Sequence, residues 1–414
     1  MPTEPATIAL IRFGCLAVAA AFFLLLFRLA RIPGGFPAAI LAAGLLTGVA
    51  LGPTVLGALR PELHQRFAVG ALHERQALRD LEERHELDLL VLGHTGVSPV
   101  ALDEQRRDFA LQRRPLHDAV TKASHEFQTP VRRITLVLVC LAVFLAGCAA
   151  QKRTSSHPEA SMLAAAAAGI LAVIFAGIIN AILIGALLGA TRAEAVPLGF
   201  ALAGGSFFAA TPLRWLGAAA RSLDVRFSLL CGIGVVLIAI AAMPARTELG
   251  PWIVAIVLSL AAGAWLGRTC KRRTRCAAKT ALACVVLPTL VAFAASHADF
   301  HALLGSTRAV IFVIIAVAIT GLGAWMGFSL GMGIFGSDLQ RHAITQRWIE
   351  ANAAGVGLTQ AVMLAVLCAA ALIDGATSSG AAVIAAFILA ALFTECSLDL
   401  VRRWIVAIDN PPSE

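Results

Sequence analysis

The apolar segments of this sequence hold very few side chains that could do chemistry. Asn180 lies in the middle of one such run, where its amide could ligate an ion, although an intramembrane Asn more often hydrogen-bonds a neighbouring helix. The charged side chains that we considered in these segments lie near segment ends, and they are Asp299, Asp374, Glu395, Arg214 and Arg308. A charge at the bilayer centre costs ~2.5–3.5 kcal/mol on insertion scales. Chemistry that needs a buried carboxylate is therefore not predicted.

Histidines and cysteines are the other chemically versatile side chains. Six of the ten histidines fall within 59–131, and they are His64, His73, His85, His94, His117 and His125. Histidine changes charge near neutral pH, so this set could sense pH or bind a metal. No two of them are four residues apart, and a solvated helical surface explains them without a metal. Most of the nine cysteines lie in apolar runs, so we predict neither a metal site nor a cofactor.

Composition places the chain in a lipid bilayer. Of its 414 residues 59% are hydrophobic and 14% are charged, whereas a soluble domain is about 45–50% apolar and about 25% charged. The charges separate continuous apolar runs of roughly 17–30 residues, which is the length of a membrane-spanning helix. Loop arginines and lysines explain the net charge of +8. Because no basic face with interleaved aromatics occurs, no nucleic-acid partner is predicted.

These runs predict an all-α polytopic membrane protein with about eleven transmembrane helices. The 277–296 segment is the least distinct of them. The predicted spans are 7–28, 36–58, 132–150, 160–190, 196–213, 227–244, 250–267, 277–296, 306–334, 351–373 and 379–398.

Lysine and arginine placement predicts the orientation of the chain. Loop 268–279 holds six basic residues and no acid, so we place it in the cytoplasm. Counting spans outward from this loop puts the N-terminus and segment 59–131 outside and the C-terminus in the cytoplasm. Because the spans are helical, we expect a multi-pass protein of the inner (plasma) membrane.

Segment 59–131 is the one large polar region, and it holds twelve of the 25 acidic residues. Apolar residues recur at helical spacing from about His64 to Leu92, a turn follows from Gly93 to Pro99, and Leu102, Phe109 and Leu116 are seven apart. Ser98 could cap the second helix, with Pro99 at its first position. The pattern predicts an antiparallel helical hairpin outside the cytoplasm.

The hairpin divides the chain into four predicted parts. Residues 1–58 form the first two transmembrane helices, and 59–131 form the extracytoplasmic helical hairpin. Residues 132–405 form the remaining transmembrane bundle, and 406–414 form a cytoplasmic tail.

The run from Gly44 to Gly57 resembles the second membrane helix of Kef-type monovalent cation:proton antiporters, of the sodium/hydrogen exchanger superfamily. That family reads G-x-x-x-G-P-[ST]-x-L-G there, and Gly48–Gly57 fits it. Val143–Gly147 and Ala209–Pro212 resemble later family motifs in the same order, each with one family residue missing. The likeness covers most of the chain except 59–131. Small-xxx-small faces are common, so close helix packing is the favoured local explanation of the glycines, whereas the longer G-P-T-V-L-G string favours the family resemblance.

The resemblance implies inverted repeats, two broken helices that cross near the membrane midplane, exchange of monovalent cations for protons, and a homodimer. Half-helix ends at such a crossing could hold an ion through backbone dipoles, although simple kinks and polar packing remain an alternative. Leu229–Val236, where the family carries its acidic ion ligand, contains neither Asp nor Asn, so the ion site is predicted to be degenerate. The candidate ion-binding residues are Thr211, Pro212, Asn352, Gly355, Gly357, Thr359, Gln360 and Asn180.

Two functions stay open at this stage. The first is secondary transport on an antiporter-like fold, with monovalent cations and protons as partners. The second is a transport-inactive membrane sensor or scaffold that acts through hairpin 59–131, with a partner in the cell envelope. No enzyme is predicted, because no Ser/His or Asp/Asp pair occurs inside the spans.

Overall fold

The structure is a computed structural model of the 414-residue chain. It describes residues 5–30, 35–95, 99–149, 160–192, 272–320 and 380–393, together with isolated residues in 195–202 and 255–266 and Cys396. The described part of the chain is helical and contains no strand. Contacts group the chain into two compact units. Unit 1 comprises Met1–Gly14 and Val55–Ile134, and unit 2 comprises Cys15–Thr54 and Thr135–Glu414.

Four helices in the described ranges are long and apolar enough to cross a membrane. They are Pro5–Ala30, Ala38–Gly57, Gln105–Ala146 and Cys276–Ala295. Three of them coincide with the predicted spans 7–28, 36–58 and 277–296, and the last of these is the most deeply packed of the four. Gln105–Ala146 overlaps the predicted span 132–150 but begins within the predicted hairpin. The helical fold class, with helices of membrane-spanning length, is therefore confirmed. The predicted total of eleven spans is not tested, because several of the predicted spans lie outside the described residues.

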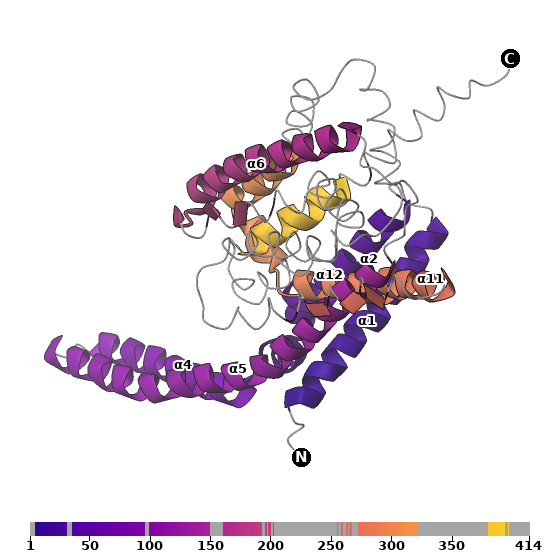
Figure 1. Ribbon diagram of the computed structural model, residues 1–414. Helices are drawn as coiled ribbons and strands as arrows, with labels where there is room; N and C mark the ends of the chain where they lie inside the picture. The colour runs from indigo at the N-terminus through magenta and orange to yellow at the C-terminus, as the bar shows by residue number, and fades with distance from the viewer. Residues whose placement is uncertain are drawn as a thin grey trace. The chain divides into compact units, whose positions relative to one another are not determined.

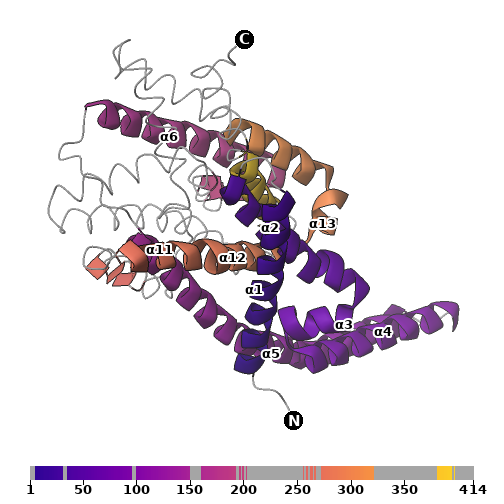
Figure 2. The ribbon, with the colours of Figure 1, turned by 90° about the vertical axis from the view of Figure 1, so that its right-hand side faces the viewer.

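Unit 1 contains the predicted hairpin. Its elements are helix α3 (Pro61–His64), the π-helix η2 (Gln65–Val69), α4 (Leu72–Thr95) and the first part of α5 (Pro99–Ala149). Figures 1 and 2 both show α4 running alongside α5. The His85 ring stacks on the Phe109 ring with centroids 3.9 Å apart, and Glu82 pairs with Arg113 at 3.2 Å. From Glu82 to His85 residue numbers rise along α4, while those of their partners fall from Arg113 to Phe109 along α5. The two helices are therefore antiparallel, as the sequence pattern predicts.

The hairpin differs from the prediction at both of its ends. The first arm begins at Leu72 rather than near His64, because Gly70 and Ala71 have φ angles of 72° and 54° and interrupt the helix. A Cβ atom at Gly70 would collide with the Phe127 ring, so glycine permits both the turn and the close approach. At the other end, α5 is one helix of 51 residues that includes Pro115 and Pro130. No break therefore separates the second arm of the hairpin from the third predicted span.

Unit 2 contains a close contact between α2 (Gly35–Leu51) and α12 (Leu287–Ala295). Every residue of α12 is buried. A Cβ atom at Gly48 would lie 2.7 Å from the Ala292 carbonyl oxygen and would overlap the Ala295 methyl group. The glycines therefore let the two backbones approach more closely than any side chain would allow.

Short elements surround this contact. The π-helix η1 (Pro53–Gly57) follows α2, while α11 (Arg272–Ala281) and the π-helix η3 (Leu282–Val286) precede α12. Helix α13 (Phe300–Gly305) follows α12, and the Asp299 carboxylate caps it by accepting hydrogen bonds from the backbone N–H groups of His301 and Ala302 at 2.9 and 3.2 Å. Asp299 thus lies at a helix end, as predicted.

The remaining described helices also belong to unit 2. They are α1 beyond Gly14 (α1 spans Pro5–Ala30), α6 (Ala160–Leu188), Thr307–Thr320 and Gly380–Phe393. The last three fall within the predicted spans 160–190, 306–334 and 379–398.

Candidate functional site

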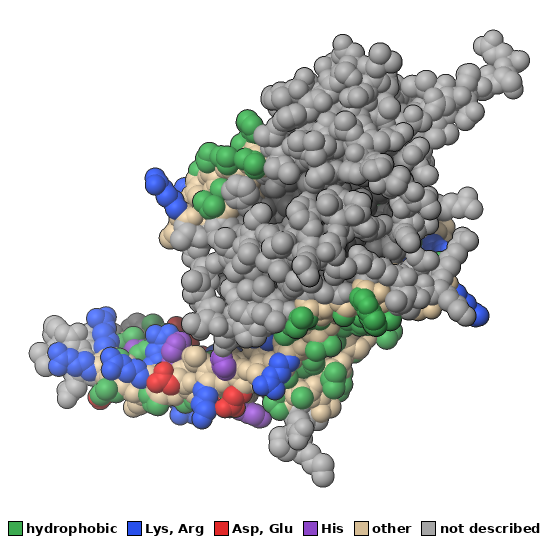
Figure 3. All heavy atoms as spheres, in the orientation of Figure 1, with side chains coloured by type: hydrophobic (Ala, Val, Ile, Leu, Met, Phe, Trp, Pro, Cys, Tyr) green, Lys and Arg blue, Asp and Glu red, His purple; other side chains and the backbone are tan. Residues whose placement is uncertain are grey.

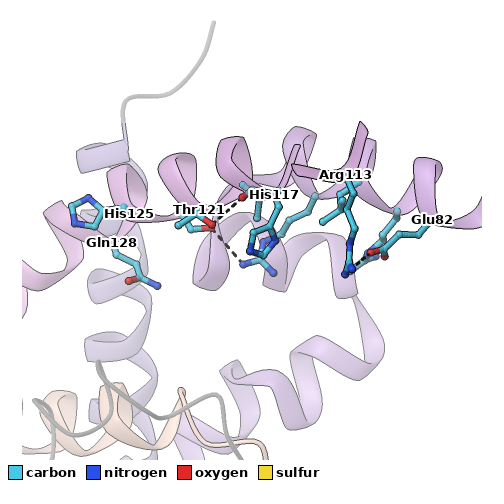
Figure 4. Close-up of a pocket in the computed structure, with 11 residues that line it drawn as sticks. Glu82, Arg113, His117, Thr121, His125 and Gln128 are labelled. Atoms are coloured by element: carbon cyan, nitrogen blue, oxygen red, sulfur yellow. Dashed lines mark hydrogen bonds and ion pairs between the residues drawn. The ribbon is translucent and has the colours of Figure 1, made fainter. Parts of the chain in front are cut away.

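Unit 1 contains a groove of about 620 Å³ between α4 and α5. Its α4 side is formed by residues at helical positions i, i+3, i+4 and i+7, namely Arg75, Leu78, Arg79 and Glu82. Its α5 side is formed by Arg113, His117, Val120, Thr121, Ser124, His125 and Gln128. Two aliphatic side chains thus lie among polar and charged ones. Figure 4 shows Glu82 and Arg113 pointing toward one another at one end and His125 and Gln128 at the other.

The positive charges in this groove are unequally compensated. The Arg113 guanidinium is paired with the Glu82 carboxylate at 3.2 Å. Among the described residues, neither Arg75 nor Arg79 has an acidic side chain within ion-pair distance. Arg75 Nη2 donates only a long hydrogen bond, of 3.5 Å, to Ser124 Oγ, and its Nε atom is buried without a partner.

The pKa of Arg75 reflects this environment. Burial lowers it from its ordinary value, and the charge of Arg79, one helical turn away, lowers it further. Two like charges four residues apart on a helix destabilise it. The groove therefore contains positive charge that its own side chains leave uncompensated.

Two of the six histidines of the hairpin, His117 and His125, line the groove, because their eight-residue spacing places them on one face of α5. The groove around them is lined by three arginines, two hydroxyl groups and one carboxylate, that of Glu82. In the described residues no group of three or more His, Cys, Asp or Glu side chains could hold a metal ion. His85 instead stacks on Phe109 and helps to join the two helices.

Asn180 is the single predicted ion-binding residue that the structure describes. It is fully buried on α6, and its Nδ2 atom donates a hydrogen bond of 3.2 Å to Thr320 Oγ1 on the helix Thr307–Thr320. It therefore joins two helices, which is the alternative that the sequence favours for an intramembrane Asn. Its Oδ1 atom is buried and has no hydrogen-bond partner.

The other seven predicted ion-binding residues lie outside the described residues. They are Thr211, Pro212, Asn352, Gly355, Gly357, Thr359 and Gln360. The structure therefore does not bring the predicted crossing site together, and that site stays a prediction.

The Gly44–Gly57 motif has a structural role in this molecule. Added Cβ atoms at Gly44 and Gly48 would collide with α12, and one at Gly52 would collide with the Gly48 carbonyl oxygen and lie 3.2 Å from Ser296, the residue that follows α12. Thr54, two residues after Gly52 in the motif, accepts a hydrogen bond of 3.1 Å through Oγ1 from the Phe300 N–H. The Thr54 carbonyl oxygen lies 3.0 Å from His301 Nε2. Helix packing and attachment of α13 account for the motif without an ion.

Sequence reasoning missed Arg12, which is the one charged residue between Ile8 and Phe27. Its side chain is only 7% exposed, and Nη1 donates a hydrogen bond of 3.4 Å to the Ala68 carbonyl oxygen of η2. A charge inside an apolar run was the signal that could have found it. The contact attaches α1 to the segment that leads into the hairpin.

Comparison of the chain with protein-family models, with curated proteins and with solved structures finds no match. The site must therefore be interpreted from its own geometry.

Proposed function

We propose that this chain is a membrane-anchored binding protein whose working part is hairpin 59–131. The supporting observation is the groove between α4 and α5, in which Arg75 and Arg79 share one face without an acidic partner in the described part of the chain. A helix that packs against one partner ordinarily presents an apolar stripe at these positions. Charged residues that cost stability at a packed face are typical of binding sites.

The proposal includes the predicted topology, with about eleven spans in the inner membrane, antiporter-like inverted repeats, and the N-terminus and hairpin outside. Helix α5 supports the link between binding and membrane, because it carries both the groove residues and the apolar stretch up to Ala149. Residues 59–131 contain no cysteine, so a thiol introduced there reports on sidedness.

The sidedness experiment replaces the exposed Gln112 with cysteine and labels intact cells with a membrane-impermeant maleimide. We expect labelling of Gln112→Cys beyond that of the unsubstituted chain. The exposed Cys276 serves as the internal control, because its predicted cytoplasmic loop should react only after permeabilisation. Labelling of position 112 only after permeabilisation would reverse the proposed orientation.

Secondary transport is the second candidate function. One observation favours it, namely the buried Asn180 Oδ1 atom, which has no hydrogen-bond partner. An amide oxygen is a ligand that hard cations accept. In this candidate Asn180 belongs to the predicted degenerate ion site, and the protein exchanges monovalent cations for protons.

An exchange assay decides between the two candidates. The full chain is reconstituted in liposomes with an imposed pH gradient, Na⁺, K⁺ or Li⁺ is added outside, and internal pH is followed with a dye. The binding-protein proposal predicts no cation-dependent dissipation from folded, inserted protein. Dissipation that Asn180→Leu abolishes, and that Arg75→Gln with Arg79→Gln leaves intact, would establish transport instead.

A further inference from the structure

We propose that the groove between α4 and α5 binds a dianionic ligand that carries a phosphate group. This inference deepens the proposed function and rests on it, because it names the chemical class that the hairpin recognises.

The charge of the groove is the first argument. Three guanidinium groups and one carboxylate line it, so its net charge is positive by two with the histidines neutral. The hairpin as a whole is slightly acidic, with twelve acidic and ten basic residues in 59–131. Positive charge is therefore concentrated at this groove. Elsewhere along the hairpin, side chains of both charges and histidines are mixed, as Figure 3 shows. A phosphate monoester carries about −1.5 to −2 at neutral pH, which matches this charge.

The geometry of the donors is the second argument. Arg75 and Arg79 lie one turn apart on the same helix, and both face the groove. A guanidinium is a planar fork that binds phosphate oxygens through two parallel hydrogen bonds, and an anion held between two such forks would relieve their mutual repulsion. Across the groove, the Ser124 hydroxyl of α5 accepts from Arg75 Nη2 and keeps its own hydrogen for a ligand, whereas the Thr121 hydroxyl already donates to the His117 carbonyl oxygen at 2.9 Å.

The Glu82–Arg113 ion pair is the third argument. This pair neutralises the Arg113 guanidinium with the only carboxylate that lines the groove. The guanidinium groups of Arg75 and Arg79 therefore stay available for a ligand. Glu82 also adds negative charge beside the proposed phosphate position, so it opposes binding of an anion. Its removal would release Arg113 and should strengthen binding.

The remaining lining fits a small molecule that is more than phosphate alone. Leu78 and Val120 provide apolar contact next to the charged groups. A volume of about 620 Å³ is within the roughly 300–1,000 Å³ of sites for small ligands. The same chemistry can come from a free organic phosphate or from the headgroup of a monoester phospholipid, and the two sources are separable by experiment.

The test is isothermal titration of the purified full chain with three probes: inorganic phosphate, glycerol 3-phosphate and succinate, the last being a dianion without phosphate. We expect glycerol 3-phosphate to bind most tightly and succinate at least about tenfold more weakly, since one phosphate group presents three oxygens and about −1.5 to −2 charge to both forks, whereas each succinate carboxylate carries two oxygens and a single charge. Binding should weaken as salt is raised, because exposed charges are screened.

Three variants locate the site. Arg75→Gln combined with Arg79→Gln should weaken binding by about 10- to 100-fold, since charge-assisted hydrogen bonds are lost. The matched control Arg84→Gln removes an exposed arginine of the same helix outside the groove and should leave affinity unchanged. Glu82→Gln should tighten binding by several-fold, which keeps the proposal testable even if the double variant fails to fold.

A second arm identifies the source of the phosphate. The full chain is placed in nanodiscs of phosphatidylcholine with or without phosphatidic acid, and the titration with glycerol 3-phosphate is repeated. If the wild type binds glycerol 3-phosphate in phosphatidylcholine discs and loses this binding in discs with phosphatidic acid, a lipid headgroup occupies the groove. Unchanged binding in both discs means a free phosphate ligand, and both results support the proposed chemistry.

Two results would overturn the inference. Equal or tighter binding of succinate would replace phosphate with another anion and leave the binding-protein proposal standing. Binding that is insensitive to both the arginine and the Glu82 substitutions, or no binding of any probe, would remove the groove as an anion site. The liposome exchange assay decides the broader function separately.

Discussion

The α2–α12 contact of unit 2 and the α4–α5 groove of unit 1 are both helix pairs, and they are built on opposite principles. Small residues bring α2 and α12 together, and α12 is buried along its length. Between α4 and α5, arginines occupy the facing stripe and a groove of about 620 Å³ remains. Close packing is how helices associate in lipid, and a polar groove is compatible with a helix pair that contacts water. The first pair is built for cohesion, and the second has the features of a binding site.

The largest expected effect concerns the glycine contact. We predict that Gly48→Ala lowers the free energy of unfolding by about 1–3 kcal/mol, as overpacking does in tight interfaces. The added Cβ would meet the Ala295 methyl group and the backbone of α12, which cannot move aside cheaply. Thermal unfolding in detergent, followed by circular dichroism, measures the change.

The matched control is Gly14→Ala on α1. No atom lies within 4 Å of its added Cβ, so stability should be unchanged or rise by less than about 1 kcal/mol from the better helix propensity of alanine. Equal losses in both variants would mean that the α2–α12 contact is not a packing requirement.

The second prediction asks whether a polar contact matters within the apolar unit. Asn180→Ala removes the interhelical hydrogen bond to Thr320 and should destabilise the chain by about 0.6 kcal/mol, and by no more than about 1.7 kcal/mol. Both variants remove the buried Oδ1 atom that has no partner, but Asn180→Leu should recover part of this loss, because leucine fills the space that alanine leaves empty. The same unfolding assay compares the two variants. If leucine is worse than alanine, the cavity around Asn180 is polar and belongs to a site.

The outcome of sequence reasoning differs between the same two regions. Apolar run length predicted the four membrane-type helices, since a span of fixed thickness leaves a clear pattern in sequence. The seven-residue spacing that includes Phe109 predicted the hairpin, and the structure confirms its antiparallel pairing. The break at Gly70 and Ala71 was missed, because it depends on positive φ angles required by the approach of Phe127.

The groove was not predicted, although all of its residues are in one polar segment. Sequence patterns gave the histidines as candidates, with a solvated helical surface as their alternative, and assigned no role to the arginines. Arg75 and Arg113 belong to one groove only because α4 and α5 pair in one register, which a single sequence specifies weakly. The glycine motif shows the converse case, where a string that resembles an ion exchanger is accounted for by packing against α12.

The third prediction sharpens the view that the hairpin is held by few specific contacts. His85→Ala removes the ring stacked on Phe109 and should cost about 0.5–1.5 kcal/mol of local stability. Hydrogen exchange should accelerate at amides of α4 and the paired part of α5, and not at those of α12. The control His73→Ala changes an exposed residue of the same helix and should leave exchange unchanged. Uniform acceleration across both units would mean that the hairpin unfolds only together with the rest.

The smallest effect has the opposite sign and bears most directly on the comparison. Arg75→Gln removes one member of the like-charged pair with Arg79. Burial of Arg75, and then the charge of Arg79, lower the pKa of Arg75. Without ligand, hairpin stability should therefore rise by about 0.2–0.5 kcal/mol at low ionic strength, and the gain should shrink as salt screens the pair. Arg84→Gln is the control, and hydrogen exchange of α4 gives the readout. A binding site is recognised by such a residue, whose loss stabilises the unliganded protein and weakens ligand binding. If Arg75→Gln instead destabilised the hairpin at every salt concentration, Arg75 would be a structural contact like Gly48, and the contrast between the two helix pairs would disappear.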